Sequence, residues 1–348
     1  MTFYIFVYVI LSFLAFASLF SQNKQKKTIY GFLSFLIIFF VVVLRKKTVG
    51  GDLTNYEPQF LTIRVLTLKQ LILFPDPGYA LLNWIIGHFT EKFYVFMQLY
   101  GALGVILLYV CLKRLSIDVS TSFLVFIMQQ GFPRLCSEIR QVFATLLVFY
   151  GVSYLLEKRW KKWVLFTGLA GTFHATAAIG FLYKPIVFTK HKFEFMVKIV
   201  FSFFCFLAIT SLLIPIVVTF YKTNDYSSRV VAGEGRNLFL FVFTILVLIG
   251  YLFRKQSYSI HNRRTIAYNA CIFGLVVQVL SFGFSLLNRL TAYYWIFAVI
   301  LAPYILLSLK KSERFLLVSL LLPLSFLWFV KSLIVDSSGI VPYLFFFQ

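Results

Sequence analysis

Long apolar runs separated by short charged loops constrain this chain more than any other feature of its sequence. The runs are about 16–22 residues long, the length that a helix needs to cross the ~30 Å hydrocarbon core of a bilayer. Only 13% of the residues are charged, about half the share found in soluble domains, so few polar side chains remain to cover a surface in water. The sequence therefore predicts an all-α, polytopic integral membrane protein.

The candidate spans predict about ten to twelve membrane-embedded segments in a single transmembrane domain over residues 1–348. The opening sixteen residues have no basic start and no convincing cleavage site, so the first run is expected to remain as a helix rather than a removed signal peptide. The spans are 3–20, 29–44, 93–112, 119–133, 139–156, 163–183, 194–220, 238–253, 266–285, 290–309 and 315–334.

Two stretches do not fit this scheme as simple spans. Residues 79–90 are too short to cross a bilayer and are expected to form an interfacial helix. Residues 163–183 run between two basic clusters that both look cytoplasmic. Either this segment re-enters without crossing, with a break near Gly168, Gly171 or Pro185, or one basic cluster lies outside.

Short basic loops recur between the apolar runs, and the net charge is +21. Such loops orient membrane proteins with their lysines and arginines in the cytoplasm, so the N-terminus is predicted to lie outside. Nucleic-acid binding is not expected, because no basic stretch is long enough to form a domain. The basic loops are 24–27, 113–114, 157–162, 254–264 and 310–314.

The loops of the opposite side, 45–92, 134–140 and 221–237, mix arginines with carboxylates. Few cations are expected there, so these arginines indicate an anionic ligand. A guanidinium matches phosphate oxygens with two parallel hydrogen bonds, which favours phosphate as that ligand. The candidate phosphate-binding residues, including one in the turn at 285–289, are Arg45, Arg134, Arg140, Arg229, Arg236 and Arg289.

Simpler structural interpretations compete with these functional ones. The stretch from Arg45 to Asp52 could be a basic helix end followed by a glycine turn, and Glu138 could pair with Arg140. His174 lies in an apolar segment and could be a core residue with a satisfied hydrogen bond, although an imidazole also suits general-base catalysis.

Several short motifs resemble the EpsG/Wzy-type polysaccharide polymerase family. The resemblance covers roughly residues 30–343, with Gly51 where the family often has Thr and Thr176 where it often has Ser; neither difference removes a charged group. The motifs are Arg45-x-x-x-Val49-Gly50-x-Asp52-x-x-x-Tyr56, Ile139-Arg140-Gln141 with Ala144, Phe173-His174-x-Thr176-Ala177, Arg289 followed by Tyr293, and Pro342-Tyr343.

The resemblance implies a GT-C-like membrane glycosyltransferase that polymerises a surface polysaccharide, such as an O-antigen, a capsule or an exopolysaccharide. It would work at the outer face of the bacterial cytoplasmic (inner) membrane, moving the glycan of one undecaprenyl pyrophosphate onto a lipid-linked repeat unit. Asp52 or His174 would be the base, and the sequence does not choose between them. The remaining residues expected at this site are Glu138, Gln141, Tyr56 and Tyr293.

No metal or other cofactor is expected, because arginines can stabilise the leaving pyrophosphate and no dense carboxylate cluster is present to hold Mg²⁺. The expected partners are the lipid-linked oligosaccharide, the bilayer, and chain-length regulator and flippase proteins. Two alternatives stay open. One is a lipid-linked oligosaccharide flippase or other transporter, with charges along a path that reaches both leaflets. The other is an O-antigen ligase-type transferase.

Overall fold

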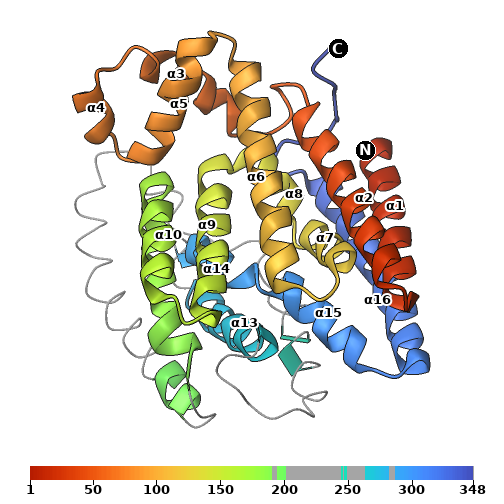
Figure 1. The fold of residues 1–348 in the computed structure, drawn as a ribbon. Coiled ribbons are helices and arrows are strands. Elements are labelled where there is room, and N and C mark those ends of the chain that lie inside the picture. The colour runs from red at the N-terminus through yellow and green to blue at the C-terminus, as the bar shows by residue number, and fades with distance from the viewer. Residues whose placement is uncertain (190–193, 201–243, 246, 249–262, 282–286, 348) are drawn as a thin grey trace.

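The computed structural model describes residues 1–189, 194–200, 244–245, 247–248, 263–281 and 287–347 (Figure 1). In this part of the chain the regular secondary structure is helical, which confirms the predicted all-α class. The helices, in chain order, are α1 (Thr2–Phe20), α2 (Lys24–Val43), α3 (Leu53–Ile63), α4 (Leu68–Ile72), α5 (Pro77–Phe89), α6 (Phe93–Leu115), α7 (Val119–Met128), α8 (Gly131–Ser137), α9 (Ile139–Leu156), α10 (Trp160–Phe173), η1 (Ala175–Leu182), η2 (Tyr183–Val187), α13 (Arg263–Leu280), α14 (Leu287–Trp295), α15 (Ala298–Ser308) and α16 (Lys311–Val335).

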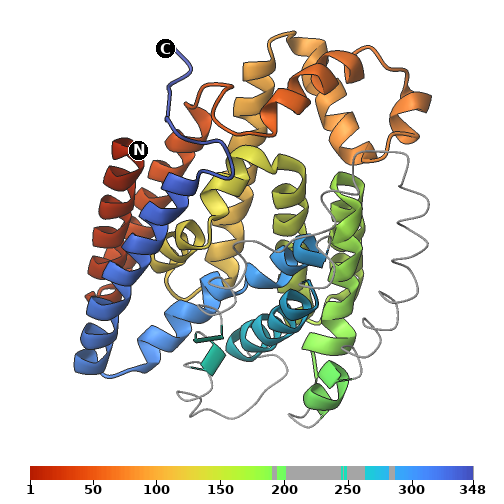
Figure 2. The ribbon, with the colours of Figure 1, turned by 180° about the vertical axis from the view of Figure 1, so that it is seen from behind.

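Within the described residues, six helical segments are long and apolar enough to cross a membrane, so the chain is a multi-pass membrane protein. They are α1, α2, α6, α9, α14 with α15, and α16. The α9 segment and the α14–α15 segment are mostly buried inside the bundle, whereas α1, α2 and α16 lie together along one side (Figures 1 and 2). The predicted spans 194–220 and 238–253 fall almost wholly outside the described residues.

The basic loops meet at one end of the bundle, which we name the basic end. Lys27 Nζ at the start of α2 lies 3.9 Å from Asp118 Oδ2 at the start of α7. Arg114 at the end of α6 pairs with Glu157 at the end of α9. Arg314 in α16 donates a hydrogen bond of 2.7 Å to the carbonyl oxygen at the end of α1. The predicted basic loops 24–27, 113–114, 157–162 and 310–314 therefore share one end, whereas residues 254–262 of the fifth loop lie outside the described residues.

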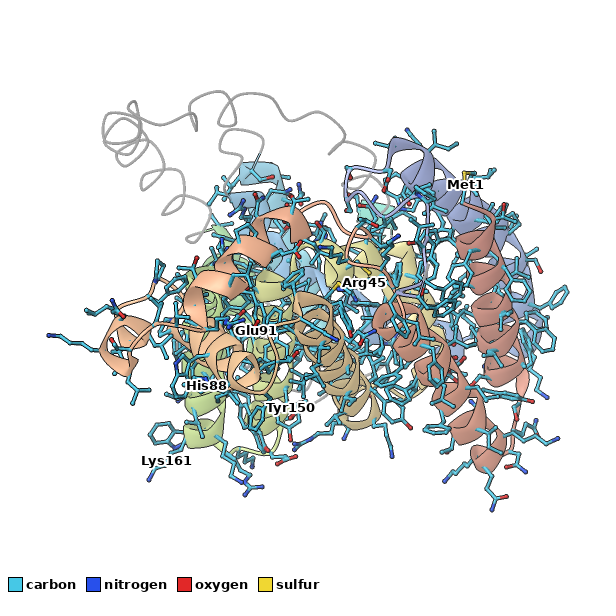
Figure 3. All side chains as sticks on the ribbon, turned by 90° about the horizontal axis from the view of Figure 1, so that it is seen from above. Met1, Arg45, His88, Glu91, Tyr150 and Lys161 are labelled. Carbon is cyan, nitrogen blue, oxygen red and sulfur yellow. The ribbon has the colours of Figure 1, made fainter. Side chains whose placement is uncertain are left out.

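Helices α3, α4 and α5 form a cap over the opposite end, which we name the cap end (Figures 1 and 3). The two chain termini lie here too: Tyr4 donates to the carbonyl of Ile340 at 2.8 Å, and the Gly50 N–H donates to the carbonyl of Gly339 at 2.8 Å. As expected for residues 79–90, α5 belongs to this cap and does not cross the bundle.

The predicted span 163–183 is a helical hairpin that enters and leaves at the basic end. Lys184 in η2 lies 5.6 Å from the ring centre of Trp160, and the Phe181 ring lies 5.7 Å from the Trp163 ring, so the two arms are antiparallel. The re-entrant alternative therefore describes this segment.

The expected position of the break in this hairpin is wrong, because the chain turns at His174. Gly168 and Gly171 stay inside α10, where their Cα atoms face open space, and Pro185 lies within η2. His174 instead has an extended backbone, which ends α10 and starts the returning arm.

The predicted span 119–133 is also interrupted, because α7 ends at Met128 and α8 starts at Gly131. Gln130 between them has a left-handed backbone with φ of 59°, which a continuous helix does not allow. Pro133 fits the first turn of α8, where its missing N–H would have no helical partner.

A proline also shapes the contact between α7 and α15. Pro303 has no N–H to donate to the carbonyl of Val299, one turn earlier in α15. Ser122 of α7 donates to that carbonyl at 2.6 Å instead. A hydroxyl from a neighbouring helix thus satisfies a backbone acceptor that lipid could not.

Candidate active site

Arg140 lies in the first turn of α9 at the cap end and is held by three groups of the cap. Its Nη1 donates to Asp76 Oδ2 at 2.6 Å, and its Nε donates to the Tyr56 hydroxyl at 3.4 Å. The guanidinium carbon lies 5.2 Å from the ring centres of both Tyr56 and Tyr79. A carboxylate and two aromatic faces therefore fix one cation in place.

Asp76 is a candidate site residue that the sequence analysis missed. It immediately precedes Pro77 at the start of α5, and it takes the place at Arg140 that one interpretation gave to Glu138. Burial raises the pKa of the Asp76 carboxyl, and the paired Arg140 guanidinium opposes that shift. Because a guanidinium binds carboxylate and phosphate oxygens in the same way, a phosphate ligand would compete with Asp76 for Arg140.

A second group of polar side chains surrounds His174 at the tip of the α10–η1 hairpin. The Thr176 hydroxyl lies 2.6 Å from His174 Nδ1 and 3.0 Å from the Tyr293 hydroxyl of α14. The guanidiniums of Arg140 and Arg289 both lie within electrostatic range of the His174 imidazole. The hairpin and α9, which follow each other in the chain, and the distant α14 thus bring two cations within electrostatic range of one imidazole.

Gln141 joins α9 to α14 behind this group. Its Nε2 donates to the backbone carbonyl of Arg289 at 2.8 Å, while the Arg289 side chain is exposed. Tyr183 of η2 donates to the backbone carbonyl of Tyr293. These two contacts hold the α14 backbone at Arg289 and at Tyr293. Gln141 therefore lies near this group of side chains, as expected, and its amide nitrogen contacts α14.

A pocket opens on another side of α9 and brings Arg134 and Glu138 together. Apolar and aromatic side chains form most of its wall, and polar groups come from α7, α8 and α9. The pocket lining is Phe126, Gln129, Gly131, Arg134, Glu138, Gln141, Val142, Thr145, Leu146, Ala292, Trp295 and Ile296.

Arg45 does not lie on an open surface. It is 0% exposed, and its Nη1 donates to the carbonyl of Val42. Its Nε and Nη2 make no hydrogen bond within the described residues. The C-terminal segment covers it, since the Lys46 N–H donates to the carbonyl of Leu344 at 2.8 Å, and from the cap end Arg45 lies among the helices (Figure 3).

The glycines after Arg45 serve backbone packing. Gly50 has a φ of 133°, and a Cβ on it would clash with the carbonyl oxygen of Cys136 in α8. Asp52 follows as an exposed residue at the start of α3, and its N–H donates to the Ser137 hydroxyl at 3.1 Å. In the described part of the chain, the Asp52 carboxylate makes no hydrogen bond or ion pair with Arg140 or His174.

Arg229, Arg236 and the predicted loop 221–237 lie outside the described residues. Among the residues that are described, no three His, Cys, Asp or Glu side chains gather in a way that could hold a metal ion.

The fold and this site define a multi-pass helical membrane protein with arginines and a histidine gathered at the end opposite its basic loops. The chain belongs to the EpsG family, whose model matches residues 28–345. The family indicates a polysaccharide polymerase in the broad sense, with glycosyltransferase-like chemistry. No curated protein and no solved structure matches the chain significantly.

Proposed function

We propose that the protein polymerises a surface polysaccharide from undecaprenyl-pyrophosphate-linked units at the outer face of the bacterial cytoplasmic membrane. One observation carries this proposal: the guanidiniums of Arg140 and Arg289 both lie within electrostatic range of the His174 imidazole at the cap end. The basic loops occupy the other end, and the positive-inside rule puts those loops in the cytoplasm, so the cap end faces outward.

The proposed reaction forms one bond and breaks one. A hydroxyl oxygen of the acceptor sugar bonds to the anomeric carbon of the donor glycan, while the bond from that carbon to the pyrophosphate oxygen breaks. The leaving pyrophosphate keeps the electron pair, and the hydroxyl proton moves to a base. Negative charge grows on the leaving pyrophosphate in the transition state. Arginines that stabilise this charge lower the activation free energy.

Arg140 and Arg289 are the cations that we assign to the pyrophosphate. Arg289 has an exposed side chain, and Arg140 can exchange its Asp76 carboxylate for a phosphate oxygen. Arg229 and Arg236 remain candidates for the same role. Arg45 is fully buried and has no part in this assignment.

The pocket between α7, α8, α9 and α14 suits a sugar better than a phosphate. Arg134 and Glu138 together add no net charge, and Gln129, Gln141 and Thr145 supply hydrogen-bonding groups beside aromatic walls. Neutral polar groups next to aromatic faces bind sugar hydroxyls and sugar rings, whereas a carboxylate disfavours a second anion. We assign Arg134, Glu138 and Gln141 to the sugar of one substrate.

His174 and Asp52 are the two candidate bases. His174 lies within electrostatic range of both cations of the proposed clamp, so a proton acceptor and the leaving-group site would lie in the same region. Asp52 is exposed on the cap near Tyr56 and would need the substrate to extend over α3. Losing the true base would lower turnover by about 10²–10⁴-fold.

The test uses purified protein in detergent and defined lipid-linked repeat units. We expect these units to grow longer without nucleotide sugar, ATP or an ion gradient, and to do so in the presence of EDTA. His174→Ala and Asp52→Asn, compared in this assay, identify the base. If the protein never elongates the units but moves them between the leaflets of a vesicle, the transporter alternative is correct.

A further inference from the structure

We propose that Arg134 and Glu138 make the pocket between α7, α8, α9 and α14 a subsite for an uncharged sugar. In this subsite Glu138 disfavours acidic sugars, and Arg134 disfavours amino sugars that carry a positive charge. The inference deepens the proposed function and rests on it, because it names the class of sugar that one subsite accepts. It makes the two side chains specificity determinants rather than catalytic residues.

Glu138 lies at the joint between α8 and α9, beside several groups that could neutralise its carboxylate. Arg134 is one helical turn earlier, yet within the described residues no ion pair joins the two side chains, and only a backbone hydrogen bond of 2.8 Å links the two residues. Arg140, two positions later, pairs with Asp76 instead. The Glu138 side chain also makes no capping hydrogen bond to the first turn of α9. Its carboxylate is therefore available to a ligand in the pocket.

Arg134 is available in the same way. It is partly buried in the bundle, and in the described part of the chain its guanidinium makes no hydrogen bond or ion pair. Ionisable side chains inside a membrane bundle are costly and usually have a partner or a function. Two unpaired side chains of opposite charge that line one pocket indicate that a bound group completes their interactions.

The pocket suits a group that both donates and accepts hydrogen bonds. The Thr145 hydroxyl gives its hydrogen to the Gln141 carbonyl at 2.9 Å, so it can only accept from a ligand, as the Glu138 carboxylate does. The Arg134 guanidinium can only donate. A sugar hydroxyl can do both, so one sugar ring with several hydroxyls can satisfy both kinds of group. Hydrogen bonds to the two charged groups are the stronger ones.

The two charges together favour an uncharged ligand. An acidic sugar is attracted by Arg134 but repelled by Glu138 one turn away, and its carboxylate loses water between the apolar walls of the pocket. A cationic amino sugar meets the reverse combination. A neutral sugar keeps the charge-assisted hydrogen bonds to both side chains and has no charge to strip of water.

The pocket adjoins the proposed pyrophosphate site. Ala292 of α14 lies in the pocket wall three residues after Arg289, so the two share one face of the helix. Gln141, which is also in the wall, donates to the backbone carbonyl of Arg289 at 2.8 Å. A sugar in the pocket would lie about one helical turn from a cation that we assign to the pyrophosphate, as a lipid-linked sugar requires.

Binding of methyl glycosides tests the subsite without any assay of activity. The probes are the methyl glycosides of glucose, glucuronic acid and glucosamine, and those of the matching galactose series. They are compared at about pH 6, where carboxylates are ionised and amines are protonated. Among the five tryptophans, Trp295 lines the pocket, so the fluorescence change that Trp295→Phe removes reports binding to the full-length protein in detergent. We expect the wild type to bind the neutral glycosides more tightly than the charged ones.

Charge variants of the pair should change this preference in opposite directions. In Glu138→Gln the affinity for the acidic glycoside relative to the neutral one should rise about 10-fold, and in Arg134→Gln the cationic glycoside should gain by a similar factor. The double variant should return to the wild-type order while binding the neutral glycoside more weakly. The matched control is Glu57→Gln, which removes a carboxylate that pairs with Lys47 on the cap and should leave the preference unchanged.

Elongation of lipid-linked units separates this inference from the proposed function. If no neutral glycoside binds, or if the preference is unchanged in either single variant or shifts equally in the control, the subsite is wrong even when the protein elongates the units. The expected shifts in a protein that never elongates them would support the subsite and reject the proposed function. Because neither charged group has a side-chain partner in the described structure, both variants should unfold at the wild-type midpoint in detergent. A much lower midpoint would show that the charges stabilise the fold and would also overturn the subsite.

Discussion

At the scale of single residues, the proposed site depends on the Arg140 guanidinium, which would exchange one of its present partners for a phosphate. Arg140 contacts Asp76, Tyr56 and Tyr79, and of these only Asp76 carries a negative charge. A phosphate that reaches Arg140 must displace this carboxylate or share the cation with it. If Arg140 binds the pyrophosphate as proposed, Asp76 sets how strongly it holds that anion.

We expect Asp76→Asn to strengthen binding of inorganic pyrophosphate, because the competing charge is removed while the side-chain shape is kept. If the pair contributes about 1 kcal/mol, half-inhibition of elongation should need about 5-fold less pyrophosphate. The matched control is Glu57→Gln, which removes a carboxylate from the same cap that pairs with Lys47 instead. Equal inhibition of wild type and Asp76→Asn would show that Arg140 does not bind the leaving group.

Replacing Arg140 by Lys should restore little activity compared with Arg140→Ala. An ammonium keeps the charge but cannot place one donor on a carboxylate and others on a phosphate while stacking on two rings. The measurement is the length distribution of the surface glycan on a gel, with the protein level in the membrane as the control. Wild-type chain lengths in Arg140→Ala would exclude Arg140 from the site. Wild-type chain lengths in Arg140→Lys would show that a single positive charge is enough there.

The sequence indicated the candidate site residues better than it indicated their neighbours. Arg140, Gln141, His174, Arg289 and Tyr293 were all identified from motifs, and the structure gathers them. The partner of Arg140 lies 64 positions away, at a helix start that carries no distinctive pattern, so no local rule could select Asp76.

At the scale of elements, hydropathy predicted where helices run but not where they break. The predicted span 139–156 and α9 have the same bounds. Tertiary packing determines the turn at His174 and the interruption at Gln130. A hydropathy average over neighbouring residues carries no information about such packing. The hairpin is the clearest case, because its tip carries the candidate base.

Close packing of the two hairpin arms and α9 depends on Gly180. A Cβ there would lie 2.9 Å from Val148 Cγ1 and 3.0 Å from Thr167 Cγ2, so Gly180→Ala forces η1 away from its neighbours. We expect this overpacking to cost about 1–3 kcal/mol, seen as a lower midpoint of thermal unfolding in detergent, and to reduce elongation by displacing Thr176.

The matched control for Gly180→Ala is Gly168→Ala in α10. No atom lies within 4 Å of a Cβ at this position, and alanine favours a helix over glycine by about 1 kcal/mol, so the unfolding midpoint should stay the same or rise. A Gly180→Ala protein as stable and active as wild type would mean that the hairpin arms do not pack this closely.

At the scale of the whole molecule, the two ends of the bundle differ in what they carry. The basic end holds the loops rich in lysine and arginine, and the cap end holds the cluster around Arg140 and His174. Within the described residues, the side chains proposed for chemistry gather at the cap end rather than along a path between the ends. This distribution favours catalysis at one face over transport.

Labelling of single cysteines in intact cells tests this orientation, after the four native cysteines are replaced by serine or alanine. Thr54 is exposed on the cap, so Thr54→Cys should react with a membrane-impermeant maleimide added outside. Lys161→Cys in α10 and Lys184→Cys in η2 should react only after the cells are permeabilised, because the hairpin returns both positions to the basic end. Reaction of Lys161→Cys in intact cells would reverse the orientation and put the candidate site in the cytoplasm.

The same experiment tests the hairpin. Reaction at position 184 but not at 161 would show that residues 160–187 cross the membrane once, and His174 would then not lie at the tip of a hairpin.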